Sequence, residues 1–222
     1  MNENRNTSWK EMTPEQKKQY FMDYYLVKVL IGAGVLLFAA YVIISVMRPE
    51  PQFRLRIGVY DTSLGDAVKE DMEYSIRKAL STAERVEIDD SYTSLNDQDL
   101  LRVAALSTAK DLDVLIADRK IFEWLAGYGY FKDLSLSFDS AFLSSHSDDL
   151  VVCRGLKTGE GGILEENAEG NGAYYSAGIR ITEGTMKEWF DEYEEPVLGI
   201  IYESDCTADI EKLLEAFEQP GQ

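Results

Sequence analysis

The sequence predicts an α/β protein with an N-terminal transmembrane helix followed by a three-layer α/β domain that has a mainly parallel sheet. Three observations support this fold class. Residues 29–47 form a run of nineteen residues without a formal charge. Later segments have the apolar patterns of buried strands, and segments with helical periodicity alternate with them. The expected parts are residues 1–28, 29–47 and 48–222.

The uncharged run at 29–47 has the length and composition of a membrane-spanning helix. At about 1.5 Å per residue it extends about 29 Å, close to the thickness of a hydrocarbon core. Eleven of its residues are Leu, Ile, Val or Phe, and no charge opposes insertion. A cleaved signal peptide would have its apolar core closer to the N-terminus and small residues at a cleavage site after it, and the run at 29–47 has neither feature. We therefore expect a retained, single-pass signal anchor, in one long helix that begins after Thr13 as N-cap.

Basic residues near the ends of this run predict its orientation. Five precede the run and three follow it soon after: Arg5, Lys10, Lys17, Lys18 and Lys28, then Arg48, Arg54 and Arg56. This majority favours a cell-membrane protein with residues 1–28 in the cytoplasm and an extracytoplasmic domain at 48–222. The expected partners are membrane lipid around the helix and a membrane protein, because 28 cytoplasmic residues are too few for a signalling domain.

The net charge of −18 falls almost entirely on the C-terminal part. Such a charge repels nucleic acid, so DNA and RNA partners are not expected. Cys153 and Cys206 are compatible with a disulfide or with two buried free thiols. Their spacing is not that of a zinc site, and His146 is the only histidine in the sequence, so we expect neither a metal nor a cofactor.

The first half of the C-terminal domain predicts a βαβαβ order. The expected elements are a strand at 53–60, a helix at 68–80, a short strand at 86–88 with a turn at 89–91, a helix from Asn96 to Lys110, and a strand at 113–117. The last strand is apolar at four consecutive positions, which is typical of a central parallel strand. We therefore expect helices on both faces of the sheet.

Beyond Ser135 the patterns are more fragmentary, and residues 135–170 as a whole have no assigned structure. The expected fragments are a strand at 150–153, a short strand at 163–164, a hairpin at Asn171–Gly172 followed by a strand at 175–181, a capping box at 185–188, a strand at 197–201 and a helix at 210–217.

The candidate ligand-binding residues all follow predicted strands. They are Asp61, Ser63, Asp89, Asp90, Ser91, Asp118 and Arg119. Because parallel strands end at one edge of a sheet, where ligands bind, we expect these residues to line one rim. Their charge favours a cation or a hydroxyl-rich ligand over an anion. The same residue types also cap helices and form turns, which is the structural alternative.

Other motifs predict no chemistry. The glycine-rich loop at 155–162 lacks the Gly-Lys-Ser/Thr ending of a phosphate-binding loop, and His146 lies in a polar stretch that predicts a solvated loop. The acidic runs at 148–149 and 192–195 are typical of solvated faces, without calcium-loop spacing. No catalytic residue is expected.

The stretch DVLIADRKIFEWLAGYGYFKDL at 113–134 resembles extracellular solute-binding proteins of ABC transporters. A buried strand ending in Ala-Asp, a short helix, a glycine and Asp-Leu carry this resemblance, and residues 175–217 are similar to the same family's final segments. The resemblance implies part of a type 2 periplasmic-binding fold and capture of a solute. The whole arrangement also resembles uncharacterised tethered proteins of Gram-positive bacteria. Unlike transport receptors, the chain has no lipidated cysteine, and its domain is smaller.

These observations predict a non-catalytic, solute-binding-protein-like extracytoplasmic domain that serves in binding, in sensing or as an accessory module. Two alternatives stay open. One is an extracytoplasmic hydrolase that acts through carboxylates such as Asp61, Asp89 and Asp118. The other is a purely structural domain that docks on a membrane partner.

Overall fold

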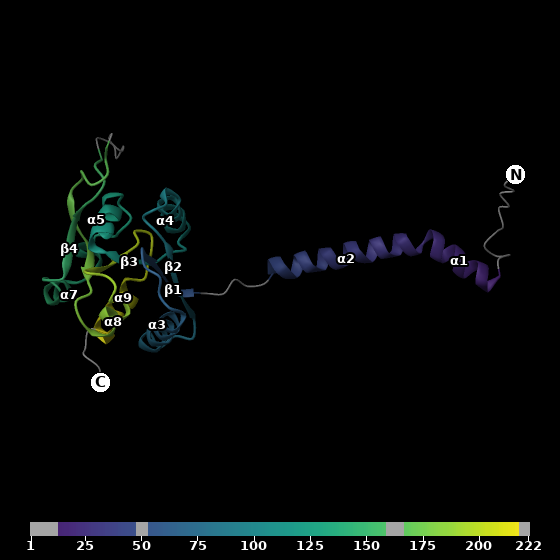
Figure 1. Cartoon of the computed structure of the whole chain (residues 1–222), viewed down its shortest axis with the longest axis horizontal. Helices are drawn as coiled ribbons and strands as arrows, with labels where there is room; N and C mark the ends of the chain where they lie inside the picture. The colour runs from purple at the N-terminus through teal and green to yellow at the C-terminus, as the bar shows by residue number, and fades with distance from the viewer. Residues whose placement is uncertain (1–12, 48–52, 159–166, 218–222) are drawn as a thin grey trace. The chain divides into compact units, whose positions relative to one another are not determined.

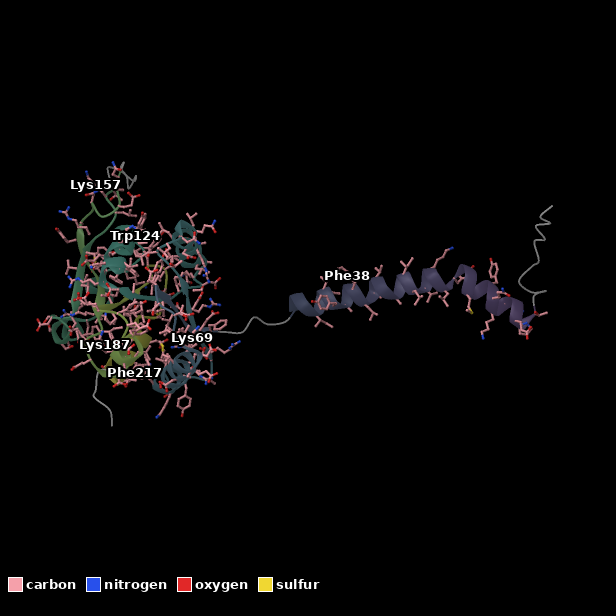
Figure 2. The ribbon with its side chains drawn as sticks, viewed as in Figure 1. Phe38, Lys69, Trp124, Lys157, Lys187 and Phe217 are labelled. Atoms are coloured by element: carbon pink, nitrogen blue, oxygen red, sulfur yellow. The ribbon has the colours of Figure 1, made fainter. Side chains whose placement is uncertain are left out.

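The computed structural model describes residues 13–47, 53–158 and 167–217 (Figure 1). The chain divides into two compact units, residues 1–51 and 52–222. The first unit contains α1 (Pro14–Tyr24) and α2 (Leu26–Met47). The helix expected after Thr13 begins where predicted, but it is interrupted at Tyr25. Large apolar side chains of α2, such as Phe38 (Figure 2), are exposed.

The predicted membrane anchor at residues 29–47 requires a correction. A spanning helix has to combine about 20 residues with an almost uninterrupted apolar composition. Among the residues that the structure describes, no helix is both long enough and apolar enough to cross a membrane. On this finding the predicted transmembrane helix is not upheld, and neither are the signal anchor and the single-pass membrane assignment that rested on it.

The second unit is an α/β domain. Its strands are β1 (Phe53–Tyr60), β2 (Arg85–Tyr92), β3 (Val114–Asp118), β4 (Leu150–Arg154), β5 (Tyr174–Arg180) and β6 (Pro196–Ile200). Its helices are α3 (Asp66–Ala79), α4 (Asp97–Ala109), α5 (Arg119–Gly127), α6 (Leu134–Ser137), α7 (Ser140–Ser145), α8 (Gly184–Trp189) and α9 (Thr207–Phe217). The predicted βαβαβ order of the first half is confirmed.

The six strands form one mixed sheet in the order β2-β1-β3-β6-β5-β4. Strands β2, β1 and β3 run parallel, whereas β6 pairs antiparallel with β3, and β5 and β4 continue antiparallel. The expected mainly parallel sheet is therefore wrong. The physical reason is that an apolar run reports burial on both faces and not strand direction: β6 is buried at every position although it is antiparallel.

Helices cover both faces of this sheet, and each face has its own hydrophobic cluster. One cluster joins odd-numbered residues of β1, such as Val59, to apolar residues of α3, α8 and α9. The other joins Tyr60 to Val103 of α4 and to Phe122 and Leu125 of α5. In Figure 1, α4 and α5 accordingly lie apart from α3, α8 and α9.

The two cysteines are free and buried. Cys153 packs in the cluster of α4 and α5, and Cys206 packs in the cluster on the opposite face of the sheet. This separation decides between the two states that the sequence allowed, in favour of two free thiols. Burial raises the pKa of Cys153 to about 11 and that of Cys206 to about 12, so both are inert thiols at neutral pH.

Three local predictions in this domain are wrong. Residues 89–91 belong to β2 and do not form a turn. Asn171–Gly172 does not close a tight hairpin, because β5 pairs with β4 across a connection that runs from residue 155 to residue 173. The expected capping box at 185–188 is absent, since the N-cap of α8 is Glu183 and makes no side-chain cap.

Two glycines in neighbouring strands allow α5 to approach the sheet closely. A Cβ atom added at Gly199 would lie 2.6 Å from both the Phe122 and the Phe131 ring, and one at Gly178 would lie 2.5 Å from the Phe122 ring. Those rings are stacked with their centroids 4.3 Å apart. The aromatic pair therefore occupies the space that side chains of β5 and β6 would otherwise fill.

Replacing Gly199 by alanine should lower the free energy of unfolding of the domain by about 1–3 kcal/mol, because the added methyl group overpacks the core. Chemical denaturation of the full chain measures this change. Gly34→Ala in α2 is the matched control, since a Cβ at Gly34 meets nothing within 4 Å. An unchanged transition for Gly199→Ala would contradict the close packing of Phe122 on the sheet.

Candidate functional site

The seven predicted site residues lie at the carboxyl edge of β1, β2 and β3. Strand β5 also ends at this edge, and β4 and β6 begin there, because both run in the opposite direction. The predicted residues nevertheless do not form one site. Asp61, Ser63, Asp90 and Ser91 line one depression, and Asp89 faces a separate groove. Asp118 is the last residue of β3, and Arg119 follows it.

The depression lies beyond the carboxyl ends of β1 and β2 and has a volume of about 510 Å³. Most of its lining residues have polar side chains. In addition to the four predicted residues, it contains Thr62, Thr93 and Ser94, together with Leu95, whose side chain is 94% exposed. Hydroxyl groups thus surround two carboxylates at the open end of the β1–β2 pair. We refer to this feature as the polar depression.

Asp61 shapes the floor of the polar depression through the backbone. It adopts a left-handed conformation with φ of 59°, which asparagine and aspartate tolerate better than most residues. Its N–H donates to the carbonyl oxygen of Tyr92 at 2.9 Å, and its Oδ1 accepts the N–H of Ser94 at 2.7 Å. These bonds hold the loops after β1 and β2 together.

Asp90 has a different role, because its carboxylate is largely satisfied within the fold. It accepts the Leu64 N–H at 2.8 Å and the ammonium group of Lys69, labelled in Figure 2, at 2.7 Å. Burial alone would raise the pKa of Asp90, but the bonds from Lys69 and Leu64 outweigh it and lower that pKa. Asp90 therefore anchors the start of α3 to β2 as a carboxylate.

The substitution Asp90→Asn should lower the free energy of unfolding by about 1–3 kcal/mol at neutral pH, because it removes a charge-assisted bond from Lys69. The pKa of Asp90 in the folded protein lies below its ordinary value of 3.8. Its stabilising effect is therefore present above that value and is lost as the pH falls through the folded pKa.

Denaturant titrations at neutral pH and in acid measure this dependence. The difference between Asp90→Asn and the unaltered chain should shrink in acid. Glu203→Gln, at an exposed residue, is the control and should change little at either pH. A difference that is equally large in acid would show that Asp90 does not act through its charge.

Asp89 and Ser91 both accept hydrogen bonds from Arg102 of α4, and Ser91 also lines the polar depression. The Arg102 guanidinium donates to Asp89 at 2.5 Å and to the Ser91 hydroxyl at 2.7 Å. Its plane also lies over the Tyr92 ring, 4.5 Å from the centroid. Asp89 therefore neither caps a helix nor forms a turn, and its carboxylate fixes α4 against the edge strand β2.

Asp118 and Arg119 belong to an interaction network at the end of β3. Asp118 caps α5 through the Lys120 N–H and also accepts the N–H of Glu195 at 3.2 Å. The Glu195 carboxylate accepts bonds from Arg119 at 2.8 Å and from Arg180 at 3.2 Å. Burial alone would raise the pKa of Glu195, but these two guanidinium groups lower it. The network binds β3, β5 and β6 together.

The crevice beyond β1 and β3 is closed by the chain itself. The strand order reverses between these strands, so this is where an α/β sheet commonly binds a ligand. Here Tyr193 occupies the position, with 6% of its surface exposed, and its hydroxyl donates to the carbonyl oxygen of Tyr60. The Thr62 hydroxyl donates to the Glu192 carboxylate at 2.6 Å. The segment Phe190–Glu195 thus fills the expected ligand site.

Replacing Tyr193 by phenylalanine should lower the free energy of unfolding by about 1–3 kcal/mol, because the buried carbonyl group of Tyr60 loses its donor. The matched control is Tyr202→Phe, since the Tyr202 side chain is 63% exposed and its hydroxyl keeps contact with water. Thermal and chemical unfolding of both variants measure the effect. Equal stability of the two would argue against a structural bond from Tyr193.

Sequence patterns did not reveal this closing segment. The acidic run at 192–195 was expected to be a solvated face, but Tyr193 is buried and Glu195 is paired. Asp149 likewise pairs with Arg180 at 3.0 Å. His146 is not solvated either: it is 8% exposed, stacks on Phe142 with ring centroids 4.1 Å apart, and places Nδ1 2.9 Å from the Phe142 carbonyl oxygen. The three aromatic residues among the acidic residues of 189–195 were the available signal.

Two further sequence features lie partly outside the described residues. The glycine-rich loop at 155–162 is described only up to residue 158, and the short strand expected at 163–164 is not described. In residues 13–47, 53–158 and 167–217, no group of three or more His, Cys, Asp or Glu side chains is arranged to hold a metal ion. A cation site therefore receives no support from the described geometry.

Comparisons of the chain with protein-family models, with curated proteins and with solved structures found no match. The resemblance to solute-binding proteins therefore stays a prediction from residues 113–134 and 175–217. Any function has to be inferred from the geometry of the domain.

Proposed function

We propose that the domain at 53–217 is a non-catalytic binding module that holds a hydroxyl-rich small molecule, such as a saccharide, in the polar depression. The observation that carries this proposal is the set of hydroxyl and carboxylate groups gathered beyond β1 and β2, in an open space of about 510 Å³. This volume lies within the usual range of ligand sites.

The chemistry of the lining favours hydroxyl groups over cations. Serine and threonine side chains both donate and accept hydrogen bonds, as sugar hydroxyls do, and the carboxylate of Asp61 adds a strong acceptor. Leu95 supplies an apolar surface at the rim for the C–H face of a sugar ring. Asp90 is satisfied by Lys69, so one carboxylate rather than a converging cluster remains for a ligand.

The closed crevice between β1 and β3 supports surface binding rather than enclosure. A two-lobed clamp would surround its solute, but the described part of the second unit contains a single sheet. The ligand would therefore rest on the carboxyl edge with one side in water. Such binding is expected to be weak, because little of the ligand surface is buried.

Saturation-transfer NMR on the full chain, with a panel of neutral mono- and oligosaccharides, polyamines and divalent cations, tests this proposal. A neutral saccharide should bind, and Asp61→Asn should weaken it about tenfold or more, because one charge-assisted hydrogen bond is lost. Asparagine retains the Oδ1 acceptor for Ser94 and tolerates the left-handed backbone. Glu203→Gln, away from the depression, should leave binding unchanged.

Two results would contradict the proposal. One is binding of polyamines or divalent cations in preference to every saccharide. The other is saccharide binding that Asp61→Asn leaves intact, which would place the ligand elsewhere on the domain.

A further inference from the structure

A second open feature lies between α4 and the β1–β2 part of the sheet, on the face that α4 covers only in part. It is a groove with a volume of about 320 Å³. Its floor is apolar, formed by Tyr92, Leu106 and Leu112, of which Tyr92 and Leu112 are buried. Five charged residues surround this floor: Arg56, Glu87, Asp89, Arg102 and Asp111. We refer to this feature as the charged groove.

Both guanidinium groups of the charged groove are fixed in place. Arg56 pairs with Asp111 and with Glu87, the latter at 3.4 Å, and lies over the Phe53 ring, 4.6 Å from its centroid. Arg102 pairs with Asp89 and lies over the Tyr92 ring. Stacking on an aromatic ring and pairing with a carboxylate both restrict the rotation of the side chain.

Each guanidinium group also has N–H donors that these pairings do not use. The pairings of Arg56 use Nη1 and Nε, and those of Arg102 use Nη1 and Nη2. Arg56 Nη2 and Arg102 Nε have no hydrogen-bond partner among the described residues. Because an arginine carries five N–H donors in a fixed plane, these remaining groups can donate hydrogen bonds to a carboxylate of a ligand.

The carboxylates of the same groove are accessible. The side chains of Glu87 and Asp111 are each 50% exposed although both contact Arg56. Each carboxylate offers about four acceptor positions, so contact with Arg56 leaves capacity for an ammonium group. The groove therefore presents guanidinium and carboxylate groups, paired with one another, around a small apolar floor.

We propose that the charged groove binds a small zwitterion that carries an ammonium group, a carboxylate and a short apolar body. The ligand carboxylate would accept from the guanidinium groups, its ammonium group would donate to Glu87 or Asp111, and its apolar body would cover Leu106 and Leu112. A ligand with only one charge would leave half of these groups without a new partner. The volume of about 320 Å³ lies at the lower end for ligand sites, which favours a small molecule.

This inference does not depend on the proposed function, since it concerns a different face of the β1–β2 pair and a different ligand class. Tyr92 borders both features, but it is buried, with 2% of its surface exposed. Binding in the charged groove can therefore be measured without a saccharide present.

Isothermal titration calorimetry on the full chain with three matched probes tests the inference. Leucine is the zwitterion, 3-methylbutylamine is the same molecule without the carboxylate, and 4-methylpentanoate is the same molecule without the ammonium group. Leucine should bind at least about tenfold more tightly than either relative, because each lacks one charge-assisted contact.

Variants of the groove residues then show which residue contacts each charged group of leucine. Arg56→Gln should weaken leucine binding about tenfold or more, whereas Arg119→Gln, which removes a paired arginine outside the groove, should not. Glu87→Gln should weaken leucine but leave 4-methylpentanoate unchanged, so the preference for the zwitterion should shrink. This second variant keeps the test valid if Arg56→Gln fails to fold, because Glu87 is exposed on the edge strand.

The inference would be overturned by any of three results: no leucine binding, equal binding of leucine and 4-methylpentanoate, or leucine binding that neither Arg56→Gln nor Glu87→Gln affects.

Discussion

The antiparallel pairing of β6 with β3 is the constraint on which the rest of the domain depends. Five residue pairs join the two strands, from Val114 opposite Ile200 to Asp118 opposite Pro196. This register places residues 190–195, which precede β6, directly at the carboxyl end of β3. Tyr193 and Glu195 then close the crevice where the strand order reverses. A parallel strand in the same position would begin at the other edge and leave that crevice open.

With the crevice closed, the polar depression and the charged groove both lie at the β1–β2 pair. Strand β2 is an edge strand, and α3 and α4 cover its two faces incompletely at its ends. The carboxyl end opens as the polar depression, and the α4 face opens as the charged groove. The two features differ in chemistry because residues 89 and 90 point to opposite sides of β2, so that Asp89 meets Arg102 and Asp90 meets Lys69.

Local patterns were sufficient to predict most of the elements but not their directions. The strand at 53–60 and the helix start at Asn96 depend on neighbouring residues, and both are confirmed. The direction of β6 depends instead on a connection through α5 to α8 that no short-range pattern encodes. The pairing of Arg119 with Glu195 joins residues 76 positions apart, so no local sequence pattern could predict it.

The site was predictable to the extent that it follows from strand ends. Asp61, Ser63, Asp90 and Ser91 were placed together correctly because each follows or ends a parallel strand. Asp118 and Arg119 were separated from them by Tyr193, whose burial the acidic residues around it concealed. The arginines of the charged groove come from the middle of β1 and of α4, where polar side chains are ordinarily solvated and give no signal.

The paired charges of the charged groove have a consequence for how it can recognise a ligand. An isolated guanidinium group would be flexible and well hydrated, and a ligand would have to order it at an entropic cost of up to about 2 kcal/mol. In the charged groove this order is already present in the folded protein. Arg56 stacks on Phe53 and pairs with Asp111, and Arg102 stacks on Tyr92 and pairs with Asp89. The same pairing also neutralises each guanidinium group, so a ligand with a single net charge gains little. Selectivity for a zwitterion therefore follows from the preorganisation of both charges.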